Sequence, residues 1–388
     1  MTRLLTLLLP ALAASTACAT YAKLEPEKVT AISLRLGGGG DTFCANDPRA
    51  HIVAAITYES GAVVETWNGE GSKGGKLRLG DLAITSRPAS IDELGRIALP
   101  RGDLRALDQR VAIHARLRDR PIAADLTVTP RHDCGGLADH AGEPGGAGGD
   151  GRAGPSIAVA LAPIDTTLNG RVLLVRVTRA GGALDYYMVD TRGPVARFEV
   201  SAAGGAGGEG EWGTSGADGA KGADGADGLD GGECQDGGHG WDGEDGEAGG
   251  EGSDGGDGGD GGQGGTIVIE YAPGHSRLVD RVGFRVSGGA AGEGGEGGAG
   301  GSGGSGGEGG DGGNAGASRD RTGRKCSTEN GQDGRGGASG PSGGQGDDGD
   351  DGRPGADGWV HARPVDASAL WAREIAAGAA ISIESTDR

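Results

Sequence analysis

Four stretches of this chain carry glycine at every third position, and all four have the same length. They span 204–231, 237–264, 289–316 and 331–358, and each holds ten in-phase glycines in 28 residues. A flexible linker requires neither a fixed period nor a fixed length. The pattern therefore predicts four rods, named here rods 1 to 4 in chain order, that lie side by side.

The period also indicates the conformation of the rods. Glycine at every third residue is typical of an extended helix with three residues per turn, which leaves one face free of side chains. Such a helix makes no internal hydrogen bonds, so its backbone N–H and C=O groups need water or a neighbouring segment. A collagen triple helix supplies neighbours from three chains, whereas a polyglycine-II bundle supplies them from one. The runs resemble the glycine-rich antifreeze proteins and phage adhesins that use the second arrangement.

Composition favours the single-chain bundle over collagen, although the Gly-Ala-Asp triplets of 216–227 resemble bacterial collagen-like proteins. Collagen-like sequences carry at least roughly 15–20% proline, whereas the only prolines in the rods are Pro341 and Pro354. The rods hold 24 acidic residues against three basic ones. Three copies in register would stack like charges with few opposing partners. A monomer is therefore expected, with a collagen-like trimer as the alternative.

Rod 3 differs from the others because nearly every triplet of 294–313 reads Gly-Gly-X. Two bare faces allow neighbours to approach on two sides, so rod 3 is expected at the centre of the bundle. Rods 1, 2 and 4 are expected toward the outside, with Asp and Glu in water. At ~3.1 Å per residue, a 28-residue rod would be roughly 87 Å long.

The connections between the rods predict their directions. Residues 232–236 join rods 1 and 2, and residues 317–330 join rods 3 and 4; these loops contain Cys234 and Cys326. If the rods alternate in direction, both loops lie at the same end of the bundle. The sequence therefore predicts a Cys234–Cys326 disulfide at the tip and, by elimination, a Cys44–Cys134 disulfide in the amino-terminal domain.

Residues 1–18 have the pattern of an export signal, with Arg3 before an apolar run and a zone of small residues. The stretch 15–18 resembles a bacterial lipobox, which implies lipidation of Cys18, although Ser15 stands where leucine is typical. An outer-membrane or cell-surface lipoprotein, held to the bacterial membrane by its lipid, is the expected location. The alternative is ordinary cleavage and a periplasmic or secreted protein.

Alternating apolar residues predict a mainly β chain outside the rods. After a linker at 19–28, seven or so short strands in 29–134 suggest an immunoglobulin-like β-sandwich, with an order similar to bacterial Ig-like repeats. The expected strands are 29–36, 52–58, 63–67, 82–84, 96–99, 111–117 and 122–128, and the last two are expected to form a hairpin. A glycine-rich linker is expected at 135–155. Residues 156–388 are expected to form a discontinuous β platform that carries the rods, with a helix at 367–377 and a strand at 380–384.

The charge distribution excludes one class of partner. Of the 56 acidic residues, 14 lie in 19–131 against 16 basic ones, so the net charge of −20 belongs to the glycine-rich half. No extended basic surface is predicted, and nucleic acid is not an expected partner. No nucleophile elbow, Ser-His-Asp set or phosphate loop is found, so no catalytic residue is proposed and an enzyme is not expected.

Three groups of residues invite a functional interpretation. The cluster His132, Asp133, Cys134, Asp139 and His140 could bind a metal, but a disulfide in a polar loop explains it more simply, and no metal site is predicted. The aspartates do not complete a calcium β-roll repeat, so weak Ca²⁺ association with the rods is the most that is expected and no cofactor is predicted. His239 and Trp241 occupy outward triplet positions and could make a contact near the tip.

Taken together, the chain resembles a bacterial collagen-like or glycine-rich surface lipoprotein of the polyglycine-II type with an Ig-like amino-terminal domain. That resemblance implies a structural or adhesive role, in which a rigid acidic projection contacts surface glycans or matrix. The alternative function is a module that binds ice or glycans on the flat face of the rods.

Overall fold

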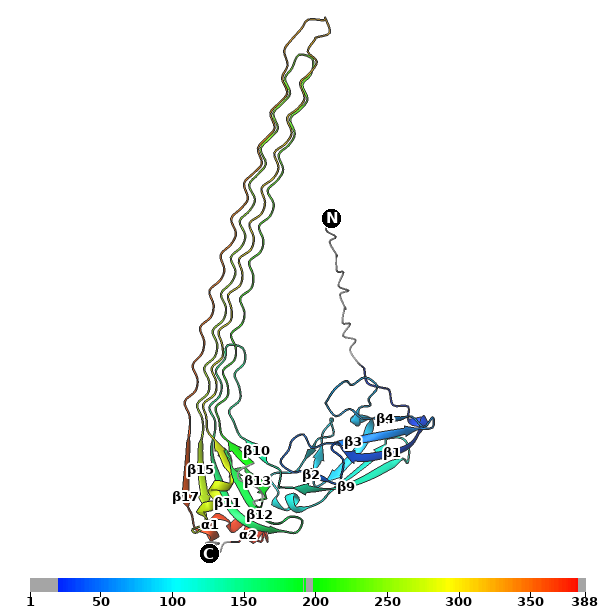
Figure 1. Ribbon diagram of the computed structural model, residues 1–388, viewed down its shortest axis with the longest axis vertical. Coiled ribbons are helices and arrows are strands. Elements are labelled where there is room, and N and C mark those ends of the chain that lie inside the picture. Colours follow the sequence, from blue (N-terminus) through cyan, green and yellow to red (C-terminus); the bar gives the residue numbers. More distant parts are fainter. Residues whose placement is uncertain (1–19, 191, 193–197, 383–388) are drawn as a thin grey trace, which may run out of the picture.

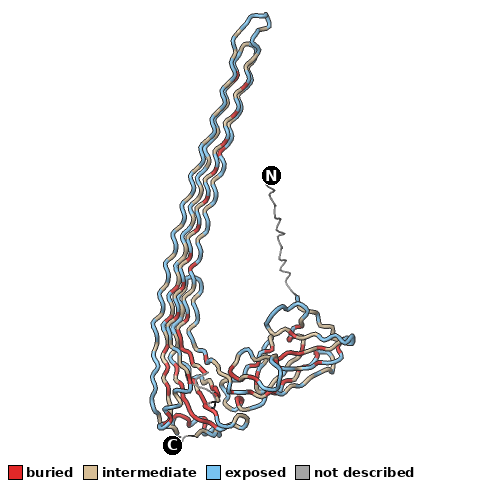
Figure 2. Tube along the Cα trace, in the orientation of Figure 1, coloured by how far each residue is buried: buried red, intermediate tan, exposed pale blue. Residues whose placement is uncertain are grey.

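The structure is a computed structural model that describes residues 20–190, 192 and 198–382. It is mainly β, as expected, and has three parts: an amino-terminal β domain, a β base and a long glycine shaft that rises from the base (Figure 1). Buried residues concentrate in the first two parts, and only a thin line of them continues into the shaft (Figure 2).

The amino-terminal domain contains a three-stranded sheet, a four-stranded sheet and a small two-stranded ribbon. Their strand orders are β1-β3-β4, β2-β9-β8-β5 and β6-β7. The strands are β1 (Val29–Leu36), β2 (Thr42–Cys44), β3 (Ile52–Tyr58), β4 (Val63–Glu65), β5 (Leu82–Arg87), β6 (Ser90–Ile91), β7 (Ile97–Ala98), β8 (Val111–Leu117) and β9 (Ala123–Arg131).

Strand β8 shows the alternation of apolar residues that is typical of a half-buried strand. Val111, Ile113, Ala115 and Leu117 of β8 are buried and alternate with more exposed residues. The strand pairs with β9 as the expected hairpin. Strands β2 and β6 were not predicted, because two or three residues are too few to show a period.

The base consists of two sheets packed face to face. One has five strands in the order β13-β12-β11-β15-β17, and the other has three in the order β10-β14-β16. Their bounds are β10 (Gly136–Asp139), β11 (Ser156–Thr166), β12 (Gly170–Thr178), β13 (Leu184–Val189), β14 (Phe198–Ser201), β15 (Thr266–Tyr271), β16 (Gly283–Arg285) and β17 (Trp359–Pro364). Strands far apart in the sequence therefore share one sheet, with an apolar core between the two layers.

Short helices complete the base and its surroundings. The helix expected at 367–377 is instead two shorter helices, α1 (Ala367–Leu370) and α2 (Ala372–Ala376), with the break at the fully buried Trp371. Of the strand expected at 380–384, the structure shows one isolated bridge, Ile164 with Ile381, and residues 383–388 lie outside the described part. The 3₁₀ helices are η1 (Pro26–Lys28), η2 (Leu79–Asp81), η3 (Leu104–Asp108), η4 (Ala180–Gly182) and η5 (Ser276–Arg281).

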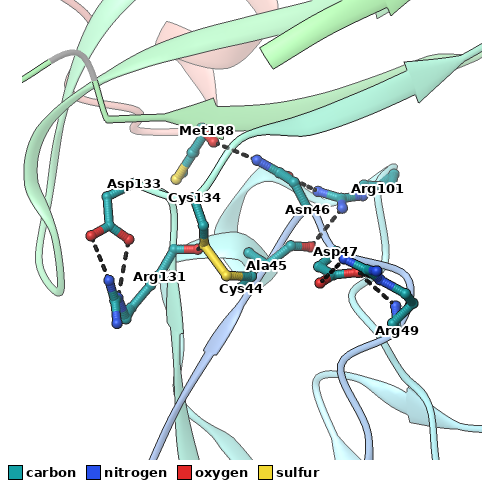
Figure 3. The surroundings of a disulfide bond; sticks show 10 residues. All are labelled: Cys44, Ala45, Asn46, Asp47, Arg49, Arg101, Arg131, Asp133, Cys134 and Met188. Carbon is teal, nitrogen blue, oxygen red and sulfur yellow. Dashed lines mark hydrogen bonds and ion pairs between the residues drawn. A yellow bond between two sulfur atoms is a disulfide. The ribbon is translucent and has the colours of Figure 1, made fainter. Parts of the chain in front are cut away.

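The amino-terminal domain and the base share one continuous core, and we call their contact the joint. The core of the domain continues into β11, β12 and β13 and includes Leu370 and Trp371. Beside the Cys44–Cys134 disulfide, the Asn46 side chain donates to the Met188 carbonyl of β13 over 3.1 Å, and Arg101 donates to Asn46 over 3.0 Å (Figure 3). The two parts are therefore firmly connected.

Each rod is a direct continuation of a strand of the base. Strand β14 leads into rod 1 and β16 into rod 3, while rod 2 leads into β15 and rod 4 into β17. The register of the strands persists in the shaft. Ser201 pairs with Arg285 in the base, and rods 1 and 3 keep the same separation of 84 residues where Asp218 meets Ser302. The base therefore sets the register of the shaft.

Backbone hydrogen bonds join the rods in both directions. Rods 1 and 3 run parallel, as do rods 2 and 4, while the remaining contacts are antiparallel. At one level, the Gly301 N–H donates to Gly250 of rod 2, Gly343 of rod 4 donates to the Gly301 carbonyl, and Gly219 of rod 1 donates to Ser302. Rod 3 is central, as predicted, and its in-phase glycines are buried along most of its length. Rod 2 also contacts all three other rods, so its expected outer position was wrong.

The segment 135–155, expected as a linker, is part of the structure. Strand β10 pairs with β14, and residues 142–154 form a short glycine hairpin that packs against the bottom of rods 1 and 2. On rod 1, a Cβ at Gly205 or Gly208 would lie 2.0 or 1.6 Å from a carbonyl oxygen of this hairpin. Where the hairpin ends, the same face of rod 1 carries side chains, beginning with Glu211. On this part of rod 1, the double glycines therefore coincide with the height of the hairpin 142–154.

Candidate functional site

The aspartates of the rods were expected as solvated charge, but many of them hold the rods together. Asp218 accepts a hydrogen bond from the Ser302 N–H over 2.7 Å, while the next residue, Gly219, donates to the Ser302 carbonyl over 2.8 Å. One Asp-Gly pair thus forms hydrogen bonds with both the N–H and the C=O of one residue on the neighbouring rod. We call this arrangement the Asp-Gly clamp.

The clamp recurs along much of both pairs of parallel rods. Its members between rods 1 and 3 and between rods 2 and 4, named by the acidic residue, are Asp218, Asp224, Asp227, Asp230, Asp236, Asp242, Asp245, Asp254, Asp257 and Asp260. The sequence carried this signal, because in each case Asp directly precedes an in-phase glycine.

One exception shows how closely the clamp follows the backbone. At a separation of 93 residues, which rods 2 and 4 keep throughout, Ala248 stands opposite Pro341. Proline has no N–H to donate, so an aspartate at position 248 would have no partner there. The neighbouring Gly249 still donates to the Pro341 carbonyl over 2.9 Å. At this position, the absence of aspartate agrees with the absence of a donor on the opposing residue.

The two residues expected near the tip have different roles. His239 occupies a clamp position, where its Nδ1 accepts the Gln332 N–H over 2.9 Å. It serves there as a substitute for aspartate. Trp241 is 72% exposed, and Leu229 on rod 1 is 84% exposed. The Trp241 N–H donates to Ala226, three residues before Leu229, so these two apolar side chains lie near the distal end of adjacent rods.

The tip itself is a closed, cross-linked structure, as predicted. Cys234 and Cys326 form a disulfide there, and the Cys234 N–H donates to Ala317 over 3.0 Å. Beyond it, residues 318–326 form a small hairpin in which Arg319 and Lys325 make an isolated antiparallel bridge. Asp320 accepts hydrogen bonds from the Thr322 and Arg324 N–H groups and holds the turn.

A cleft at the joint is the other concave feature of interest. It has a volume of about 570 Å³ and is bordered by η3, α2 and the end of β11. Glu374 is buried beside it and accepts hydrogen bonds from Tyr186 over 2.7 Å and from Arg176 over 3.0 Å. Asp108 accepts from the Thr167 and Leu168 N–H groups. These polar groups are occupied in connecting the elements around the cleft, which supports a structural role.

The joint also changes the pKa values of two of its groups. Burial and the hydrogen bond to Glu374 raise the pKa of Tyr186 to about 12. Burial alone would raise the pKa of Glu374, but hydrogen bonds from Tyr186 and Arg176 outweigh it and lower that pKa below the usual value. The Glu374 carboxylate and the Tyr186 phenol therefore stabilise each other in these charge states.

The cysteine cluster of the amino-terminal domain is a structural element. Cys134 is bonded to Cys44, as predicted, so it offers no free thiolate. His132 is buried, with Nε2 3.2 Å from the Leu107 carbonyl, and burial lowers its pKa. Within 20–190, 192 and 198–382, no group of three or more potential metal ligands is found.

Comparison with known proteins gives no relative: no family model, curated protein or solved structure matches this chain. The two disulfides indicate an extracytoplasmic protein. In the part of the chain that the structure describes, no helix is long and apolar enough to cross a membrane. The expected signal at 1–18 and the lipidation of Cys18 lie outside the described residues.

Proposed function

We propose that this chain is a structural or adhesive protein of a bacterial cell surface, whose shaft holds the tip away from the membrane. One observation carries the proposal: hydrogen bonds and Asp-Gly clamps continue in one register from the base to the disulfide at the tip. A flexible spacer would have no such register. The lipid on Cys18 would anchor the other end, and the expected location remains the outer membrane or cell surface.

We further propose that the shaft is a polyglycine-II bundle formed by one chain. Each turn of three residues in rod 3 is bonded to three neighbouring rods, and all of these neighbours belong to the same chain. This arrangement supports a monomer, because the backbone groups between the rods already have partners. The alternative to this proposal is a collagen-like trimer.

The strand order supports the Ig-like interpretation of the amino-terminal domain. In the four-stranded sheet, β8 and β9 form a hairpin, β5 lies beside β8, and β2 pairs in parallel with β9. In the other sheet, β1 and β3 are antiparallel neighbours. If β1, β3, β5, β8 and β9 are strands A, B, C, F and G, the C-F-G sheet of an Ig domain is reproduced.

The flat face of the rods supports a second candidate only weakly. Ala217, Ala220, Ala223 and Ala226 form an exposed row at regular spacing on rod 1. Such a row suits an ice-binding or glycan-binding face. The adjacent triplet positions carry Asp218, Asp224 and Asp227, however, and dense carboxylates disfavour ice binding. A thermal hysteresis assay tests this alternative, and we expect no activity.

A shortened shaft tests the proposed function directly. Deleting 216–224, 242–250, 300–308 and 335–343 removes three triplets at matching heights from all four rods and keeps their phase. Nine residues at ~3.1 Å predict that the largest dimension in small-angle X-ray scattering falls by roughly 28 Å. The mass in solution should be that of a monomer. An unchanged dimension, a trimer, or Cys234 bonded to another chain would overturn the proposal.

A further inference from the structure

The outermost hairpin of the shaft, 318–326, carries a charge opposite to that of the rods, while the adjoining loop residues Glu233, Asp236 and Glu329 are acidic. Rods 1 to 4 contain 24 acidic residues and only Lys221, Arg335 and Arg353 as basic ones. The hairpin 318–326 contains four basic residues and a single acidic one, Asp320. The basic residues are Arg319, Arg321, Arg324 and Lys325, and all four are exposed.

Three of these cations have no acidic partner among the described residues. Arg321 forms an ion pair with Glu233 over 3.2 Å. Arg319, Arg324 and Lys325 take part in no ion pair of the described structure. The acidic side chain between them, Asp320, is occupied by the N–H groups of Thr322 and Arg324 and by the Thr322 hydroxyl.

The hairpin also fixes the spacing of the three cations. Arg319 and Lys325 face each other in the antiparallel bridge, the Asp320 N–H donates to the Arg324 carbonyl over 3.1 Å, and the Cys326 N–H donates to Ser318 over 3.0 Å. The disulfide at Cys326 directly follows Lys325. A group of cations held in this way loses less conformational freedom when it binds a multivalent anion.

The acidic shaft does not cancel this local charge. At physiological ionic strength the Debye length is about 8 Å, which is short beside the ~87 Å expected for a rod. The shaft instead repels an anionic surface along its sides. Along the shaft, the hairpin 318–326 is therefore the part that attracts an anionic partner.

We propose that the hairpin 318–326 is a binding site for an anionic polysaccharide, one that carries carboxylate, sulfate or phosphate groups. This inference rests on the adhesive form of the proposed function and names the chemistry of the partner. Arginine binds such groups through paired N–H donors. The hairpin has no aromatic residue on which nucleic-acid bases could stack and no apolar residue that could enter a membrane.

The experiment measures binding of the full oxidised protein to immobilised heparin, with neutral dextran as the reference surface. The variant R319Q/R324Q/K325Q removes the three unpaired cations. The control R110Q/R116Q/R277Q makes the same change in net charge at exposed arginines far from the tip. We expect at least about a tenfold loss of affinity for the tip variant, a change of less than about twofold for the control, and weakening by salt.

Equal losses for both variants, or no loss for the tip variant, would overturn the proposal. A second arm measures binding to vesicles of phosphatidylglycerol and phosphatidylcholine. If the protein binds these vesicles more strongly than heparin, the proposed polysaccharide is contradicted and an anionic membrane is the partner. The scattering measurement on the shortened shaft is independent of these results. If the protein is a rigid monomer that does not bind heparin, only the proposed polysaccharide ligand is contradicted. If the protein is flexible or trimeric, the proposed function is contradicted.

Discussion

The base and the shaft share one topology but are stabilised by different interactions. In the base, parallel strands pack their side chains in two layers, and residues such as Val159 and Phe198 are buried. In the shaft, the same chain segments continue in the same order with almost no side chain between them. Apolar burial therefore stabilises one end of each hairpin, and backbone hydrogen bonds stabilise the other.

This difference explains why the shaft is fixed at both ends. Ordering a residue costs roughly 1–2 kcal/mol in backbone entropy, and a hydrogen bond returns a net of about 0.5–1.5 kcal/mol. A bundle of glycine is therefore marginal by itself. The base supplies the register at one end, and the Cys234–Cys326 disulfide joins the two loops at the other.

Removing the tip disulfide should cause the largest difference in stability between the base and the shaft. The cross-link spans 92 residues, and the loss of this constraint costs about 4–5 kcal/mol in the chain-entropy description. In the variant C234S/C326S, hydrogen exchange should accelerate from the tip downward, while amides of Val159 and Leu174 in the base keep their rates. If base and shaft amides accelerate together, the two regions form one cooperative unit.

A single methyl group in the centre of the shaft should have the next largest effect. A Cβ at Gly301 would lie 2.0 Å from the Ala217 carbonyl oxygen, whereas a Cβ at Gly344 has no atom within 4 Å. Gly301→Ala should destabilise the shaft by ~1–3 kcal/mol or more because the rods must separate. Gly344→Ala, at nearly the same height, is the matched control. Equal melting temperatures of the two variants would contradict the close packing around rod 3.

At alkaline pH the joint should respond where the shaft does not. The raised pKa of Tyr186, about 12, means that its contribution is present below the ordinary value near 10 and is lost as pH rises toward 12. The lowered pKa of Glu374 means that its contribution is lost as pH falls below the usual range of a glutamate. Thermal unfolding monitored by near-UV circular dichroism should show both losses.

Tyr186→Phe is the control for the alkaline loss. This variant keeps the ring in the core but has no phenol to ionise, so its stability should stay level between pH 10 and 12 as far as this site is concerned. The rods contain no tyrosine. Amide exchange in the shaft should therefore show no matching alkaline transition, and an equal transition there would contradict the distinction between the two regions.

The smallest effect should come from one Asp-Gly clamp. Asp245→Ala removes the acceptor of the Ala338 N–H, which now receives a 2.7 Å hydrogen bond, at a cost of about 0.5–1.5 kcal/mol. Exchange at Ala338 should accelerate. Ala248→Asp adds a carboxylate opposite Pro341 and should protect no amide on rod 4. A gain of protection there would show that the clamp does not depend on the opposing N–H.

The features that the sequence predicted best are those that depend on a period. Apolar patterns located β1, β3 and β8 at their observed bounds. The connections between the rods predicted the Cys234–Cys326 disulfide and, by elimination, the Cys44–Cys134 disulfide. The Gly-Gly-X triplets correctly placed rod 3 at the centre. These features follow from repeats within one segment and from the order of neighbouring segments along the chain.

The features that escaped prediction depend on pairs of distant positions. The Asp-Gly clamp needs a partner 84 or 93 residues away, so Asp254 alone looks like solvated charge. The joint between Asn46 and Met188 and the packing of 142–154 also depend on contacts between separate segments. The sequence placed the loop 317–330 at the tip, but the basic residues of the hairpin 318–326 were not singled out as a candidate contact.

Because the four rods share one register, the length of the shaft is divided into units of three residues. In the proposed polyglycine-II conformation, three residues advance a rod by ~9 Å, and the in-phase glycines of all four rods must stay aligned. A longer or shorter shaft therefore requires triplets added or removed at the same height in every rod. Evolution can adjust the reach of such a molecule only in whole steps, and an isolated insertion of one residue would misalign every clamp above it.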